Sequence, residues 1–170
     1  MLNLDNSLII GKGANRTCYR HPSDKEKCIK VPNKSQCETQ ALEIQYYELL
    51  ASNSIALKHI SQYYGEIDTN IGKGYLYELI RDFDGEISKP ISDYLDLNPT
   101  IYIEDVTIVQ SLNILKEYLL ENRIIVRNLR PYNILFKRTS KEDGIALIID
   151  NLGHHNSNCL LYTSPSPRDA

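Results

Sequence analysis

Residues that could contact phosphate groups stand close together near the start of the chain. Gly11 and Gly13 flank a single lysine, and glycine lets backbone amides approach phosphate oxygens without a side chain in the way. Arg16 follows three residues after Gly13 and could offer a cation to the same phosphate. A Gly-x-Gly sequence between two strands is more often only a tight turn, so these residues alone leave both interpretations open.

A lysine and a glutamate further along the chain could form an ion pair beside such a site. Lys30 lies in the short apolar sequence Cys28–Val31, and taken alone it is an ordinary solvated strand lysine. Glu43 shares one face of a predicted helix with apolar residues three, four and seven positions later. Since a buried carboxylate without a cation is strongly destabilising, we expect Lys30 to pair with Glu43. Glu48 and Glu38 are the alternative carboxylates.

Two loops in the second half of the chain carry polar side chains next to predicted strands. Residues 126–135 read VRNLRPYNIL, with Asn133 just before a predicted strand, and Asp150 directly follows an apolar run. Each loop alone has a simpler explanation, in which Asn133 ends a turn and Asp150 closes a strand.

The first half of the chain is predicted to form antiparallel strands around one helix. Turn residues bound three short runs of strand formers, and Pro32 ends the third because it cannot donate a hydrogen bond to a neighbouring strand. Apolar residues in the following segment have helical spacing. The predicted elements are strands at 7–11, 17–21 and 27–31, a helix over 36–51, and a hairpin of 65–68 with 74–81 joined across 69–73.

The segment 82–99 separates this strand-rich half from a helix-rich half. It contains two prolines and a glycine, a composition typical of a boundary. Beyond it, apolar residues spaced four, three and four apart predict an amphipathic helix over 103–121. Short strands are predicted at 124–126, 134–137 and 145–149.

Taken in order, these motifs resemble those of protein kinases. Residues 126–135 align without a gap with the kinase catalytic loop, and Asp150 stands where kinases have Asp-Phe-Gly, with one residue inserted. In this resemblance Asn133 and Asp150 would hold magnesium, and Arg16 replaces the third glycine of the kinase loop. The residues that would bind or position ATP are Gly11, Gly13, Arg16, Lys30 and Glu43.

This resemblance implies an α+β, two-lobe protein-kinase-like fold. The N-lobe, residues 1–81, would hold an antiparallel sheet and one helix, and residues 82–99 would be the hinge region. Residues 100–158 would form an incomplete helical C-lobe. Residues 159–170 contain two Ser-Pro pairs and no apolar period, and we interpret them as a disordered or artefactual tail that resembles translated adapter sequence.

Longer stretches resemble the YrbL family, kinase-like proteins of the bacterial PhoP regulatory network. The resemblance spans about residues 4–153, and the C-terminal segment of the family is missing. Its most specific motifs are Arg-x-Cys-Tyr-x-His-Pro at 16–22 and Asp-Phe-Asp-Gly at 82–85. The matching stretches are 11–22, 28–31, 43–47, 72–75, 82–85, 121–126, 131–135 and 150–153.

One residue departs from the pattern of active kinases. Asn128 stands in the position of the catalytic-loop aspartate, and an amide does not accept a proton near neutral pH. The resemblance therefore implies a regulatory protein that binds ATP and magnesium with weak or no phosphotransfer, and that has a regulatory protein partner. The alternatives are an active ATP-dependent phosphotransferase and a binding-only interaction module without nucleotide.

Composition and charge argue against several other classes. The formal net charge of −3 over 170 residues offers no basic excess for nucleic acid. The longest apolar run, residues 145–149, is far short of the roughly 20 residues of a membrane span. The N-terminus lacks the basic start of a signal peptide, so we expect a cytoplasmic protein without a membrane partner. The scattered cysteines form no Cys-x-x-Cys pair, which argues against a zinc or iron site.

Overall fold

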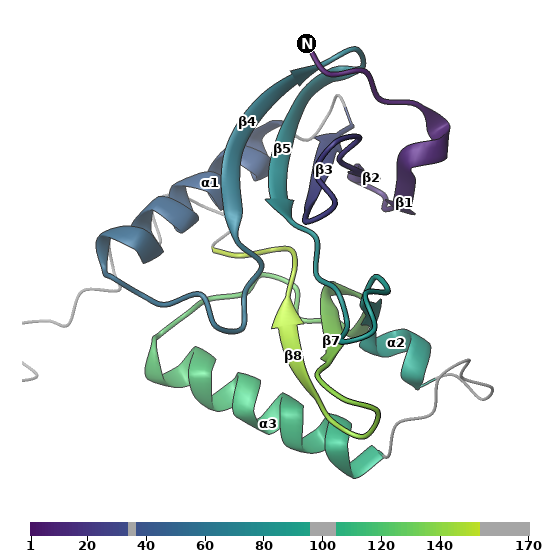
Figure 1. Cartoon of the computed structure of the whole chain (residues 1–170). Helices are drawn as coiled ribbons and strands as arrows, with labels where there is room; N and C mark the ends of the chain where they lie inside the picture. Colours follow the sequence, from purple (N-terminus) through teal and green to yellow (C-terminus); the bar gives the residue numbers. More distant parts are fainter. Residues whose placement is uncertain (34–36, 96–104, 154–170) are drawn as a thin grey trace, which may run out of the picture.

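The chain is an α+β protein with antiparallel sheets, as the sequence predicts (Figure 1). The computed structural model describes residues 1–33, 37–95 and 105–153. The strands are β1 (Ile9–Lys12), β2 (Arg16–Arg20), β3 (Lys27–Pro32), β4 (Tyr63–Thr69), β5 (Gly72–Glu78), β6 (Lys89–Pro90), β7 (Ile134–Arg138) and β8 (Gly144–Ile148). The helices are α1 (Cys37–Ser52), α2 (Ile91–Tyr94) and α3 (Asp105–Glu121).

The first five strands form one sheet with the order β1-β2-β3-β5-β4, and all neighbours are antiparallel. Strand β3 ends at Pro32 as predicted. The β4–β5 hairpin differs from the prediction, because its strands extend to Thr69 and from Gly72 and so shorten the turn. Gly72 has a φ of 127°, which favours glycine at this tight turn.

Helix α1 packs on this sheet through tyrosine side chains. The ring of Tyr47 lies 6.0 Å from that of Tyr77 in β5 and 5.5 Å from that of Tyr63 in β4. Tyr46 and Tyr47 are both buried. The apolar face predicted from helical spacing is therefore the face that meets the sheet, and it carries Glu43 inward with it.

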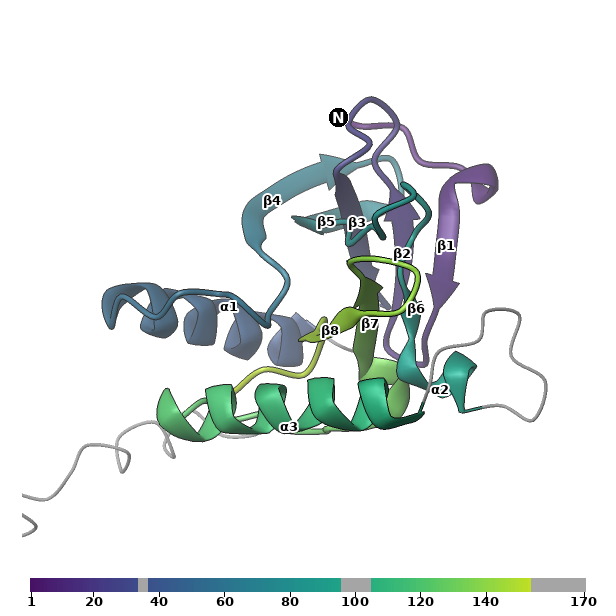
Figure 2. The ribbon, with the colours of Figure 1, turned by 60° about the horizontal axis from the view of Figure 1, so that its bottom comes forward.

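The remaining strands form a second sheet with the order β6-β7-β8. Helix α3 packs against it and runs beneath β7 and β8 in Figure 2. Ser111 of α3 accepts a hydrogen bond through its Oγ from the backbone N–H of Ala146 in β8, at 2.5 Å. Ile108 and Leu115 from the predicted apolar stripe of this helix are buried.

The chain between α3 and β7 is mostly irregular, and the predicted strand at 124–126 is wrong. Val126 makes only an isolated bridge with Leu152. Just before it, Arg123 has a φ of 53°, which turns the chain and leaves few residues to extend. A short 3₁₀ turn over Pro131–Asn133 then leads into β7.

The two sheets share one hydrophobic core. It extends from Tyr77 in the first sheet to Phe136 in the second, and both side chains are fully buried. The segment after α1 also joins them, because Ser61 donates its backbone N–H to the carbonyl of Ile148 at 3.0 Å. The predicted hinge, 82–99, contains β6 and α2, and its last residues lie outside the described ranges.

The helices of the described ranges are all too short or too polar to cross a membrane. Residues 159–170, interpreted from the sequence as a tail, lie outside the described part of the chain.

Candidate functional site

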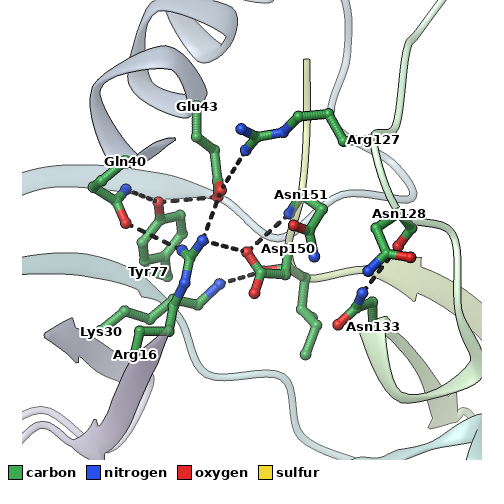
Figure 3. A network of polar contacts seen from close by, with 11 residues as sticks. Arg16, Lys30, Gln40, Glu43, Tyr77, Arg127, Asn128, Asn133, Asp150 and Asn151 are labelled. Atoms are coloured by element: carbon green, nitrogen blue, oxygen red, sulfur yellow. Dashed lines mark hydrogen bonds and ion pairs between the residues drawn. The ribbon is translucent and has the colours of Figure 1, made fainter. Parts of the chain in front are cut away.

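Candidate residues from both halves of the chain meet beside helix α1 (Figure 3). Arg16 comes from β2, Lys30 from β3 and Glu43 from α1. Asp150 follows β8, and its carboxylate contacts Arg16. The fold therefore joins residues that are far apart in the sequence into one polar network.

Glu43 lies at the centre of this network and is fully buried. Its carboxylate lies 3.2 Å from Nη2 of Arg16 and 3.5 Å from Nη2 of Arg127. The hydroxyl of Tyr77 donates a further hydrogen bond to it at 3.2 Å. Burial raises the pKa of Glu43, and the charge of Arg16 opposes this shift.

The predicted ion pair between Lys30 and Glu43 is wrong, because Arg16 on the neighbouring strand reaches Glu43 instead. Lys30 Nζ donates to the carbonyl of Ile149 and lies 4.1 Å from the ring centroid of Tyr77. Glu43 was nevertheless the correct choice of buried carboxylate.

Of the two alternative carboxylates, only Glu48 has a described side chain. Glu48 is exposed. The side chain of Glu38 lies outside the described residues.

Arg16 connects helix α1 with the end of β8. Its Nη1 donates to Oε1 of Gln40 at 3.1 Å, and its Nη2 lies 2.8 Å from Oδ1 of Asp150. Burial alone would lower the pKa of Arg16, but the charges of Glu43 and Asp150 raise it. Arg16 is therefore a fixed cation between α1 and the end of β8.

Asp150 is held as an anion. Its Oδ1 also accepts the backbone N–H of Asn151 at 2.8 Å, and Asn151 adopts a φ of 66° in this turn. Burial alone would raise the pKa of Asp150, but the charges of Lys30 and Arg16 lower it.

Asn133 lies beside Asp150 because its carbonyl accepts the backbone N–H of Ile149 at 3.2 Å. The amide nitrogen of Asn133 donates to the carbonyl of Asn128 at 2.9 Å, which leaves its side-chain oxygen as a free acceptor on the side of Asp150 (Figure 3). This oxygen and the carboxylate of Asp150 are both hard donors. By the chemistry of their side-chain oxygens, Asn133 and Asp150 are the residues here that could hold the predicted magnesium ion.

Asn128 itself is engaged elsewhere. Its Oδ1 accepts a hydrogen bond from Nε of Arg130 at 3.0 Å. As an amide it has no ionisable acid group for a proton-accepting role.

The two glycines have different surroundings. The N–H of Gly13 donates to the carbonyl of Arg16 at 2.9 Å and so closes the β1–β2 turn. Gly11 is exposed, and a Cβ at this position would meet no atom within 4 Å. Gly13 is therefore used by the turn, whereas Gly11 is open to a ligand.

A largely apolar cavity of about 210 Å³ lies between the two sheets beside Lys30. Strands of the first sheet, the segment 78–90 and the chain around β7 all contribute to its wall. The lining residues include Gly11, Cys18, Lys30, Leu135 and Ile149. A ligand in this cavity would lie beside the side chain of Lys30.

Comparison with known proteins identifies the family of the chain independently of the structure. The family model described as "PhoP regulatory network protein YrbL" matches residues 2–166. The chain belongs to the YrbL family. The YrbL proteins of Escherichia coli (strain K12) and Shigella flexneri are each 34% identical to it over 157 residues, which is 90% of this chain and 74% of the relative.

Three polar residues of this YrbL-family site were not among the sequence candidates. Gln40 lies three residues before Glu43, so helical spacing places it on the same face. Tyr75 and Tyr77 lie two residues apart on β5. This spacing indicates a strand, but it does not indicate what Tyr77 contacts. Arg127 lies within residues 126–135, and its side chain is only 3% exposed. Its position in that sequence motif was the one signal that could have pointed to it.

Proposed function

We propose that this chain is a kinase-like regulatory protein of the PhoP network that binds ATP with magnesium in the cavity beside Lys30. The observation that carries the proposal is an apolar cavity lined by Lys30 and Ile149. Asp150 follows Ile149 directly in the chain, and the carbonyl of Asn133 accepts the backbone N–H of Ile149. Apolar walls with a few convergent polar groups are typical of small-ligand sites. We extend the proposal to a two-lobe kinase-like fold, in which the cavity lies between the lobes.

Each side chain has a role in this proposal. The apolar walls, with Leu135 and Ile149, would receive the adenine ring. Lys30 would contact the phosphates, and the oxygens of Asn133 and Asp150 would hold magnesium, which supplies neutralising charge to the triphosphate. Glu43 would hold Arg16 and Arg127 in place rather than touch the nucleotide.

Phosphoryl transfer by this site is proposed to be weak or absent. Asn128 stands where kinases carry the aspartate that accepts the proton of the substrate, and its side-chain oxygen is bonded to Arg130. A positioned base contributes about 10²–10⁴-fold to such a reaction. The protein would therefore act through what it binds, with a regulatory protein partner in the cytoplasm.

The experiment is a thermal-shift measurement with ATP, with magnesium chloride, and with both. Binding at about 100 times Kd would stabilise the fold by about 2.7 kcal/mol. We expect this stabilisation in the native chain and its loss in Lys30→Met. Lys27→Met, on the same strand but outside the cavity, is the matched control and should keep it. No stabilisation of the native chain by any combination would instead favour an interaction module without nucleotide.

A transfer assay with labelled ATP separates the regulatory protein from an active phosphotransferase. We expect very slow transfer by the native chain and a faster rate in Asn128→Asp, because the acid supplies the missing proton acceptor. Native transfer at rates of order 1–100 s⁻¹, ordinary for kinases, would favour the phosphotransferase.

A further inference from the structure

Positive charges outnumber negative ones in the network around Asp150. Among the described residues, three cations (Arg16, Lys30 and Arg127) face two carboxylates, Glu43 and Asp150. All five side chains are largely withdrawn from solvent, where charges interact more strongly than in water. A buried excess of positive charge destabilises the protein unless an anion neutralises it.

Arg16 brings positive charge next to Asp150, where a metal ion bound to phosphates would lie. Its Nη2 lies 2.8 Å from Oδ1 of Asp150, and its side chain keeps 13% of its surface exposed to solvent. A guanidinium is charged at every physiological pH and matches phosphate oxygens in a bidentate geometry. A divalent cation bound to Asp150 would also be repelled by this guanidinium.

Arg127 shows how Arg16 could turn towards a phosphate without leaving Glu43 unpaired. Its side chain is 3% exposed, and its Nη2 lies 3.5 Å from Glu43. Neither its Nε nor its Nη2 has a hydrogen-bond partner. Arg127 is therefore positioned to strengthen its contact with Glu43 when Arg16 takes a ligand.

We propose that Arg16 supplies part of the charge neutralisation that magnesium would otherwise provide, so that this site binds a nucleoside triphosphate with little dependence on magnesium. The inference rests on the nucleotide binding proposed above and names the residue that sets its metal requirement. In a site with Lys30, Glu43 and Asp150 alone, the side chains would carry a net negative charge, and the triphosphate would need the metal.

The test compares ATP affinity in excess magnesium with affinity in EDTA, measured by titration calorimetry. We expect the two values to differ by less than about tenfold in the native chain. In Arg16→Gln the ratio should grow by about 10- to 100-fold, since a charge-assisted hydrogen bond is lost from the metal-free complex. Arg20→Gln, on the same strand but outside the network, should keep the native ratio.

The test separates failure of this inference from failure of the proposed nucleotide binding. ATP binding by the native chain with an unchanged ratio in Arg16→Gln would overturn the role of Arg16 while leaving nucleotide binding intact. No ATP binding under either condition would overturn both.

The native chain alone also decides the question if Arg16→Gln does not fold. Inorganic tripolyphosphate in EDTA should then bind and compete with ATP, because Arg16 and Lys30 are its cations. Failure of tripolyphosphate to bind, or loss of ATP affinity by more than about 100-fold in EDTA, would overturn the inference.

Discussion

Two clusters of charged side chains hold this fold together, and they are completed in different ways. In the first, Asp82 accepts hydrogen bonds from Ser88 Oγ at 2.5 Å and from the backbone and Nε of Arg138 at 3.0 and 2.7 Å. Asp84 takes the remaining end of Arg138, and the ring of Phe83 lies 5.3 Å from its guanidinium. No buried side-chain nitrogen or oxygen of Asp82, Ser88 or Arg138 lacks a hydrogen-bond partner.

The network around Glu43 is not completed in this way. It carries an excess of positive charge, and Arg127 keeps two nitrogens without hydrogen-bond partners. It also lies at the edge of a cavity, through Lys30. The comparison teaches that the Asp-Phe-Asp-Gly motif serves the fold, whereas the network between Arg16 and Asp150 is the one in which we propose that an anion binds.

The largest expected effect comes from breaking the self-contained cluster. Asp82→Ala leaves the buried Arg138 without its main carboxylate, and losing one partner of a buried pair costs about 3–5 kcal/mol. The more exposed Asp84→Ala should cost clearly less, because water screens its ion pair with Arg138. Urea unfolding measures both. Equal and small losses would show that this cluster does not support the fold as described.

A smaller loss is expected from Glu43→Gln. Arg16 and Tyr77 donate to different oxygens of Glu43, and an amide keeps only one of these acceptors. The charge that balances two guanidiniums is also gone, so the variant should lose about 1.5–3 kcal/mol. The exposed Glu48→Gln should change the unfolding free energy by no more than about 0.5 kcal/mol. If both variants unfold alike, Glu43 is not the residue that anchors the network.

The smallest effect concerns the metal. Asp150→Ala should remove the increase in ATP affinity that magnesium provides, a change of about tenfold or less, because Arg16 and Lys30 still neutralise the phosphates. Asp68→Ala, an exposed residue at the far end of β4, is the control. Calorimetry with and without EDTA measures both variants. An unchanged magnesium effect in Asp150→Ala would contradict the assignment of Asp150 as a metal ligand.

Local patterns predicted most of the elements. Strand formers bounded by turn residues gave β1, β2 and β3, and helical spacing gave α1 and α3 to within two residues of their observed ends. Residues 124–126 were misread because their apolar character does not reveal the turn at Arg123. Periodicity describes a segment, but a strand also needs a neighbour to pair with.

The structure brings Arg16, Lys30, Glu43 and Asp150 together, but their mutual contacts differ from those predicted. The shared face with Tyr46 and Tyr47 shows from sequence alone that Glu43 is buried. Which cation reaches it depends on how β2 and β3 lie against α1, and no local pattern carries that information. Arg16 therefore pairs with Glu43, which was the predicted partner of Lys30.

The most direct test of the account asks whether a bound nucleotide places its phosphates at Lys30. An ATP derivative with a reactive acyl phosphate transfers its acyl group to a lysine amine within reach, and mass spectrometry locates the label. We predict labelling of Lys30, with little label on the neighbouring Lys27, and suppression of the Lys30 label by excess ATP. Labelling spread over exposed lysines and unaffected by ATP would contradict nucleotide binding in this cavity.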